Sequence, residues 1–114
     1  MTKIVTTRPS FQGDVAIRRI DKLPAGLEPA TPQGGHHIVA HSETGHNHVI
    51  DSRAAQLLID KTNAFIAYLD VREPCDLTHL RDHDTHAPLH VEPGFYEVRR
   101  QRENAPEGWR RAQD

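Results

Sequence analysis

The sequence lacks most of the features that mark specialised protein classes. Cys75 is the only cysteine among 114 residues, so no intrachain disulfide can form, and a reducing, cytoplasmic compartment is expected. The formal net charge of -2 argues against nucleic acid as a partner. The apolar runs are much shorter than a membrane span, and no basic stretch followed by an apolar segment marks a secretory signal. These absences predict a soluble protein with no membrane partner.

The length and composition limit the chain to one modest domain. A chain of 114 residues suits a single hydrophobic core, and a hydrophobic content of 36% keeps that core small. We expect an N-terminal arm over residues 1–11 and a single β domain over residues 12–105. Residues 106–114 should form a C-terminal helix or tail, since Pro106 is tolerated in a first helical turn.

Short alternating segments separated by glycine and proline predict an all-β fold. In residues 15–20, Val15 and Ile17 share one face and Arg18 lies on the other. Residues 52–71 are compatible with a helix, but the turn-like Lys61-Thr62-Asn63 favours strand–turn–strand. The pattern indicates a small barrel or sandwich. Further strands are expected at residues 38–40, 46–50, 76–80, 88–91 and 95–102.

The same alternation predicts which side chains form the core. Apolar residues that repeat every second position should face inward together. The expected core consists of Ile17, Ile38, Ile50, Leu57, Ile59, Phe65, Ala67, Leu69, Leu89, Val91, Tyr96 and Val98.

Histidine is unusually abundant, with nine residues in the chain. In the sequence Thr44-Gly45-His46-Asn47-His48, an extended backbone places His46 and His48 on one face, about 6–7 Å apart. Both imidazoles can then reach one metal ion. The histidines fall into two groups, which are His36, His37, His41, His46 and His48, and then His79, His83, His86 and His90.

The second group supplies the remaining candidate metal ligands. His83 and His86 flank Asp84, which could be a ligand itself or orient a histidine. His90 has the same parity as His86 if this segment is extended. The predicted metal ligands are therefore His46, His48, His83 and His86. The cofactor would be a divalent ion such as Zn, Ni, Cu or Fe, and two histidines with one carboxylate would instead resemble a non-haem iron(II) site.

An alternative interpretation is that the histidines bind no metal. Histidine is common at partly exposed positions, and His36, His37 and His41 are expected on the surface. His79 is expected to be half-buried and hydrogen-bonded. Under this interpretation the chain is a non-enzymatic protein-interaction module or a phage-related accessory module.

No other chemistry is indicated. Cys75 lacks the surroundings of a nucleophile and should be inert. No nucleophile elbow, phosphate loop or dinucleotide fingerprint is present. The arginines at positions 99, 100, 102, 110 and 111 alternate with glutamates, which is typical of a solvated face. Whether the protein is an enzyme, what partner it has and whether it forms a homo-oligomer therefore stay open.

Two resemblances accompany these patterns. Gln12-Gly13-Asp14-Val15, residues 40–48 with the Thr-Gly-His-x-His motif, residues 83–98 and residues 101–103 together resemble an uncharacterised family of small bacterial and phage proteins. This resemblance spans most of the chain and implies a single domain without an assigned activity.

The second resemblance is to the cupin superfamily, whose fold is a double-stranded β-helix. Cupins carry an H-x-H pair on one strand and a third histidine on a later strand, and His46, His48 and His86 are similar in order. Pro93-Gly94 resembles the turn of the second cupin motif. The sequence departs from the cupin pattern because no glutamate follows His48 at the expected short interval and no histidine follows Gly94. The resemblance implies a three-histidine metal centre in a β-barrel.

Overall fold

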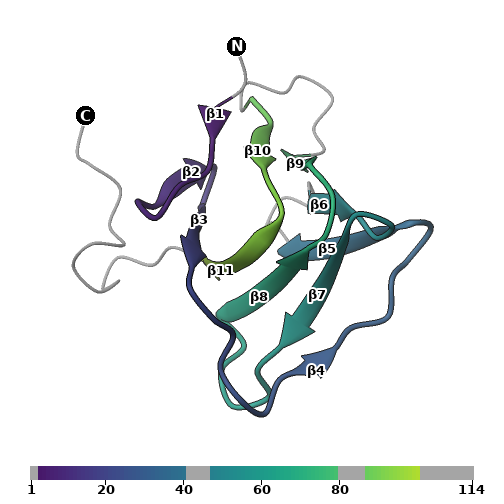
Figure 1. Cartoon of the computed structure of the whole chain (residues 1–114). Helices are drawn as coiled ribbons and strands as arrows, with labels where there is room; N and C mark the ends of the chain where they lie inside the picture. Colours follow the sequence, from purple (N-terminus) through teal and green to yellow (C-terminus); the bar gives the residue numbers. More distant parts are fainter. Residues whose placement is uncertain (1–2, 41–46, 80–86, 101–114) are drawn as a thin grey trace.

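The computed structural model describes residues 3–40, 47–79 and 87–100, which form two β-sheets (Figure 1). The five-stranded sheet contains, in spatial order, β1 (Lys3–Ile4), β10 (Leu89–Val91), β9 (Cys75–His79), β6 (His48–Asp51) and β5 (His36–Ala40). The six-stranded sheet contains β2 (Ser10–Gln12), β3 (Val15–Ile20), β11 (Gly94–Arg100), β8 (Ile66–Val71), β7 (Ala55–Ile59) and β4 (Glu28–Pro29).

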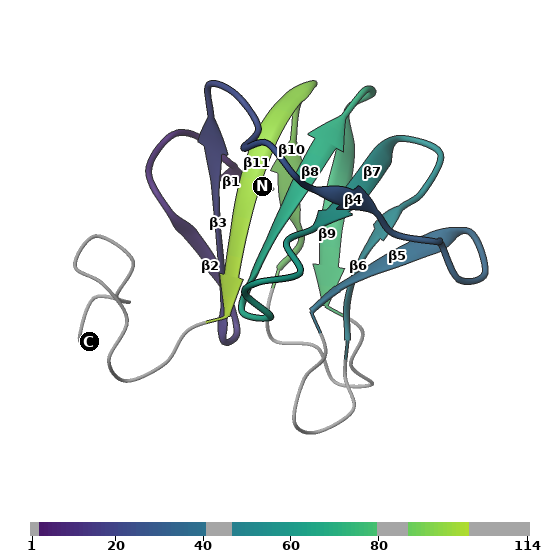
Figure 2. The same ribbon diagram turned by 90° about the horizontal axis from the view of Figure 1, so that it is seen from below.

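Antiparallel pairs of consecutive strands build both sheets. The pairs β5–β6 and β9–β10 belong to the five-stranded sheet, whereas β2–β3 and β7–β8 belong to the six-stranded sheet. Strand β11 lies between β3 and β8 and joins the two halves of the larger sheet. The sheets form an open, sandwich-like arrangement rather than a closed barrel (Figure 2). The prediction of an all-β fold is confirmed.

The hydrophobic core draws on the inward faces of both sheets. Leu77 and Val91 of the smaller sheet and Ile17, Leu69 and Tyr96 of the larger sheet are fully buried. Their alternation along each strand follows from the two-residue repeat of a β-strand. Of the expected core residues, the structure buries Ile17, Ile50, Leu57, Leu69, Leu89, Val91, Tyr96 and Val98.

Two expected core residues lie at the surface instead. Ile59 is 42% exposed and Phe65 is 37% exposed. Ile59 is the last residue of β7, and Phe65 precedes the first residue of β8. Both side chains therefore lie where the sheet ends and where fewer neighbours cover them. Ile38 and Ala67 are half-buried.

The N-terminal segment belongs to both sheets. Its strand β1 runs parallel to β10, and β2 pairs with β3. The backbone N–H of Val5, a buried residue, donates to the carbonyl of His90 at 2.9 Å. The predicted helix over residues 106–114 lies outside the described residues. The described part of the chain contains no helix of the length and apolarity needed to cross a membrane.

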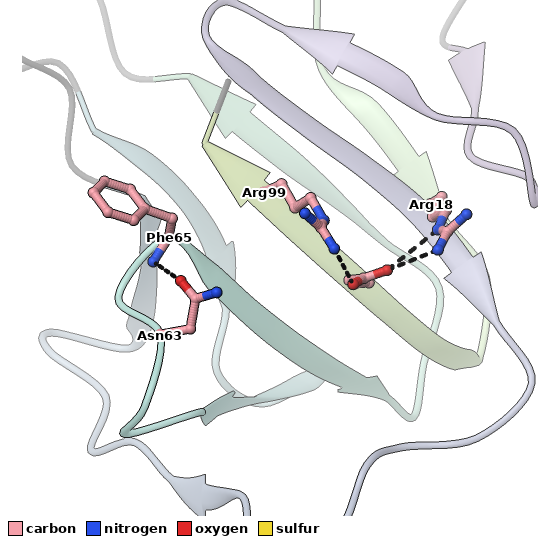
Figure 3. A network of polar contacts seen from close by, with 5 residues as sticks. Arg18, Asn63, Phe65 and Arg99 are labelled. Atoms are coloured by element: carbon pink, nitrogen blue, oxygen red, sulfur yellow. Dashed lines mark hydrogen bonds and ion pairs between the residues drawn. The ribbon is translucent and has the colours of Figure 1, made fainter. Parts of the chain in front are cut away.

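A buried carboxylate pairs with two arginines on the outer face of the larger sheet (Figure 3). Glu97 lies opposite Arg18 in the β11–β3 register. Its Oε1 accepts hydrogen bonds from Arg18 at 3.1 and 3.2 Å, and its Oε2 lies 3.5 Å from Arg99 Nη2. The carboxylate is therefore compensated although Glu97 is only 7% exposed.

Candidate functional site

Two histidines stack at one end of the sandwich. His48, the first residue of β6, lies directly opposite His79, the last residue of β9. Opposed residues of an antiparallel pair project from the same face of the sheet, and here both side chains are buried. The ring centroids are 4.1 Å apart and the ring planes differ by 8°. Two imidazolium charges at this separation would repel, so the stack favours at least one neutral ring.

Gln12 of β2 determines which ring nitrogen of His48 carries a proton. Its Nε2 donates to the carbonyl of Leu77 at 2.9 Å and to that of Ala87 at 3.1 Å. These two bonds fix the orientation of the amide, so Oε1 is the atom that lies 2.9 Å from His48 Nδ1. Because that oxygen only accepts, Nδ1 must donate. When His48 is neutral, the lone pair is therefore on Nε2.

The turn between β2 and β3 covers the two rings. Gly13 has a φ of 60°, in the left-handed region that favours glycine. A Cβ atom at this position would lie 3.5 Å from Cε1 of His48 and 3.6 Å from Cε1 of His79. The next residue, Asp14, places its Oδ1 3.4 Å from His48 Nε2. The half-exposed carboxylate of Asp14 therefore faces the lone-pair nitrogen of a fully buried imidazole.

A lone pair and a carboxylate oxygen that face each other repel, and a proton or a cation between them removes that repulsion. A proton on Nε2 would give an imidazolium–carboxylate ion pair, and a metal ion would accept electron pairs from both atoms. Histidines that bind metals usually donate their other ring N–H to an oxygen acceptor, which fixes the ring and raises its basicity. Gln12 gives His48 that arrangement.

The topology brings the points where residues 41–46 and 80–86 join the described chain to the same end of one sheet. Residues 41–46 lead into the start of β6, and residues 80–86 follow the end of β9. Because His48 and His79 pair directly, these two segments attach at neighbouring points of one sheet (Figure 2). Of the predicted ligands, only His48 falls within the described residues, and His46, His83 and His86 lie outside them.

The other histidines of the described chain are not part of this end. His36 is exposed, as expected, but His37 is only 2% exposed, so its predicted surface position is wrong. It pairs with Ile50, whose side chain lies on the inner face of β6. Burial lowers the pKa of His37. Its Nδ1 has no hydrogen-bond partner among the described residues.

His90 lies on the outer face of β10, between two carboxylates. Its Nδ1 is 2.8 Å from Asp76 Oδ1, and its Nε2 is 3.5 Å from Glu92 Oε2. The hydrogen bond to Asp76 raises the pKa of His90. Leu89 and Val91 on either side point into the core, so His90 is directed away from the stacked pair.

Within residues 3–40, 47–79 and 87–100, no three His, Cys, Asp or Glu side chains gather so that they could hold a metal ion. The described part of the end site supplies two convergent donor atoms, His48 Nε2 and Asp14 Oδ1. The sequence interpretation missed Gln12, Asp14 and the stacking role of His79. The only available signal was the turn Gln12-Gly13-Asp14, which shows no chemistry until the fold places it beside His48.

Comparison with known proteins places the chain in one family. Residues 11–101 match the model of a family described as a domain of unknown function (DUF8820), and the chain belongs to that family. This finding agrees with the expectation of an uncharacterised family. Neither the curated proteins nor the solved structures contain a significant match to the chain.

Proposed function

We propose that this protein binds a divalent metal ion at the end of the sandwich where His48 and Asp14 meet. The observation that carries the proposal is the fixed ring of His48, which donates from Nδ1 to Gln12 and directs Nε2 toward a carboxylate 3.4 Å away. Imidazole nitrogen and carboxylate oxygen are ordinary ligands of Zn and of other first-row metals.

The separation of these two atoms fits a shared ion. Two ligands that each lie about 2.0–2.1 Å from a tetrahedral metal are about 3.3–3.4 Å apart. His48 Nε2 and Asp14 Oδ1 are 3.4 Å apart. The ring of His79 is nearly parallel to that of His48, so the two lone pairs do not converge on one point. In this geometry His79 supports the ring of His48 rather than serving as a second ligand.

The remaining ligands would come from the two flanking segments. His46 is two residues from His48, which limits the distance between their Cα atoms to about 7 Å. His83 and His86 belong to the segment that follows His79. His46, His48 and Asp14 would form a set of two histidines and one carboxylate, which suits iron(II), whereas three or more imidazoles suit Zn, Ni or Cu. The cupin resemblance, with His46, His48 and His86, supports the same set of histidines.

Titration of metal-free protein tests the proposal. Chelator-treated protein should bind Zn²⁺ or Co²⁺ in a 1:1 ratio, measured by calorimetry and by the visible absorption of bound Co²⁺. Asp14→Asn and His48→Ala should each lower affinity by about tenfold or more, because too few donors remain. The same is expected of His46→Ala and His86→Ala. His36→Ala removes an exposed histidine of β5 and is the matched control.

The pH dependence gives a second measure. Protons compete for imidazole lone pairs, so binding should weaken as the pH falls through about 6.5. No stoichiometric binding by the wild type, or full binding by both Asp14→Asn and His48→Ala, would contradict the proposal.

Failure of the metal proposal would favour the second candidate function, a non-enzymatic interaction module. A phage-related role, a cytoplasmic location and a homo-oligomer stay predictions of the sequence.

A further inference from the structure

An apolar pocket opens between the two sheets. Its volume is about 210 Å³, and its walls come from β5, β7, the start of β8 and the end of β11. Val39, Leu57 and Val98 form part of the lining and are buried in the core. Val39 and Leu57 belong to different sheets, so the pocket is a gap between the layers.

The rim of this pocket exposes large apolar side chains. Ile59 and Phe65 both line it, and they are two of the three large hydrophobic residues exposed in the described part of the chain. The side chain of Asn63 accepts a hydrogen bond from the backbone N–H of Phe65 at 3.0 Å, which fixes the turn that presents this ring (Figure 3). Single exposed apolar residues are ordinary, but apolar residues that gather around a pocket indicate an occupant.

The last strand, β11, ends at the wall of this pocket. Arg100, the final residue of β11, lines the pocket, and its backbone N–H donates to the carbonyl of Phe65 at 3.1 Å. Residues 101–114 follow directly and contain Trp109, the only tryptophan of the sequence. The nine residues from Arg100 to Trp109 span at most about 30 Å, so the indole can reach the pocket with slack to spare.

We propose that the C-terminal segment, residues 101–114, folds back and places the ring of Trp109 in this pocket. Tryptophan carries a large apolar surface, and its burial stabilises a folded state more than that of most side chains. The ring would also cover Ile59 and Phe65, whose exposure is otherwise unfavourable. This inference is independent of the proposed metal site, because the pocket lining contains no histidine.

Because Trp109 is the only tryptophan, its fluorescence reports on the pocket directly. In the chain of residues 1–114 its emission should lie at shorter wavelength than that of a peptide of residues 101–114. Quenching by acrylamide should be roughly threefold weaker than in the peptide, since a buried indole is shielded from the quencher. Emission and quenching equal to those of the peptide would overturn the proposal.

Matched variants test whether this pocket, and not another contact, shields the ring of Trp109. Ile59→Glu and Phe65→Asp place a charge at the rim, and both positions tolerate it because they are exposed. Each should restore peptide-like emission while the circular dichroism spectrum is unchanged. Ile4→Asp, which changes the third exposed apolar residue on β1, should leave the fluorescence as in the wild type.

The remaining measurements identify other occupants. Trp109→Ala should increase the binding of an apolar dye, and the increase should disappear in Trp109→Ala/Phe65→Asp. Shielded fluorescence that is lost on dilution, together with dissociation of a dimer in light scattering, would show that a second copy covers the ring and would overturn the proposal. Shielding that persists in both Ile59→Glu and Phe65→Asp would overturn it as well.

Discussion

His48 and His79 lie opposite each other across β6 and β9, with their rings stacked 4.1 Å apart and with Gln12 hydrogen-bonded to His48. His48 is the first residue of β6 and His79 is the last residue of β9. The pair therefore lies next to the points where residues 41–46 and 80–86 join the sheet. Gln12, which belongs to the other sheet, fixes the orientation of the His48 ring and its tautomer when the ring is neutral.

Replacement of Gln12 should therefore affect both stability and metal binding. Gln12→Ala leaves His48 Nδ1 and two carbonyl oxygens without their partner, which should cost about 1–3 kcal/mol of unfolding free energy in urea. It should also weaken Zn²⁺ binding by about 10–100-fold, because the ring of His48 loses its orientation. Gln56→Ala is the control, since Gln56 makes comparable bonds to Ala30 and Leu57. That variant should lose stability but keep its metal affinity, and equal metal affinity in both variants would contradict the role of Gln12.

The core should respond to truncation according to burial. Leu69 is fully buried and belongs to the core cluster, so Leu69→Ala should lower the unfolding free energy by about 2–5 kcal/mol. Ile59 is 42% exposed, and Ile59→Ala should cost less than about 1 kcal/mol. Denaturant titration of the two variants measures the difference. Equal losses at the two positions would show that the core is wrongly assigned.

The stability of the metal-free protein should fall in mild acid because of His37. Burial lowers the pKa of His37, so below about pH 6.5 the unfolded chain binds a proton that the folded chain does not. Stability is therefore lost as the pH falls. Urea titrations with chelator at about pH 7.5 and pH 5.5 should show a smaller difference for His37→Leu than for the wild type.

His90 should have the opposite effect on the pH dependence. The hydrogen bond to Asp76 raises the pKa of His90. Its stabilising contribution is therefore present below about pH 6.5 and is lost as the pH rises through the folded value. The free energy of unfolding of the wild type should differ between about pH 7.5 and pH 5.5. His90→Asn should enlarge this difference, whereas His37→Leu should reduce it. Changes of the same sign in both variants would contradict these assignments.

Cys75 should react slowly with thiol reagents. Burial, followed by the charge of Asp76, raises the pKa of its thiol to about 11. At about pH 8 the thiolate fraction is then roughly 100-fold below that of a free cysteine, and modification by a disulfide reagent should be at least about tenfold slower than that of glutathione. A rate equal to that of glutathione in the native protein would contradict this expectation.

The strands could be predicted because their signal is local. The alternation in residues 15–20 identifies β3 with its observed bounds, and Lys61-Thr62-Asn63 correctly separates β7 from β8. Burial at strand ends could not be predicted in the same way. Ile59 and Phe65 have the right parity for the core but lie where the sheet stops.

The site was only partly predictable because its contacts are distant in sequence. His48 was predicted as a metal ligand from its H-x-H pattern, which is local. Gln12 is 36 residues from His48 and 65 residues from Leu77, and it bonds to both. These contacts depend on how β2 is placed against the other sheet, and no spacing rule contains that information. His37 was assigned to the surface with His36, although consecutive residues of a strand face opposite sides.

The two carbonyls that Gln12 holds belong to Leu77 and Ala87, on opposite sides of residues 80–86. The side chain of Gln12, in the six-stranded sheet, therefore binds the backbone on both sides of residues 80–86. The entropic cost of closing such a loop grows slowly with its length, so we expect insertions between positions 80 and 86 to change the free energy of unfolding little. Loops of different length grafted between these positions, followed by denaturant titration, would measure that tolerance.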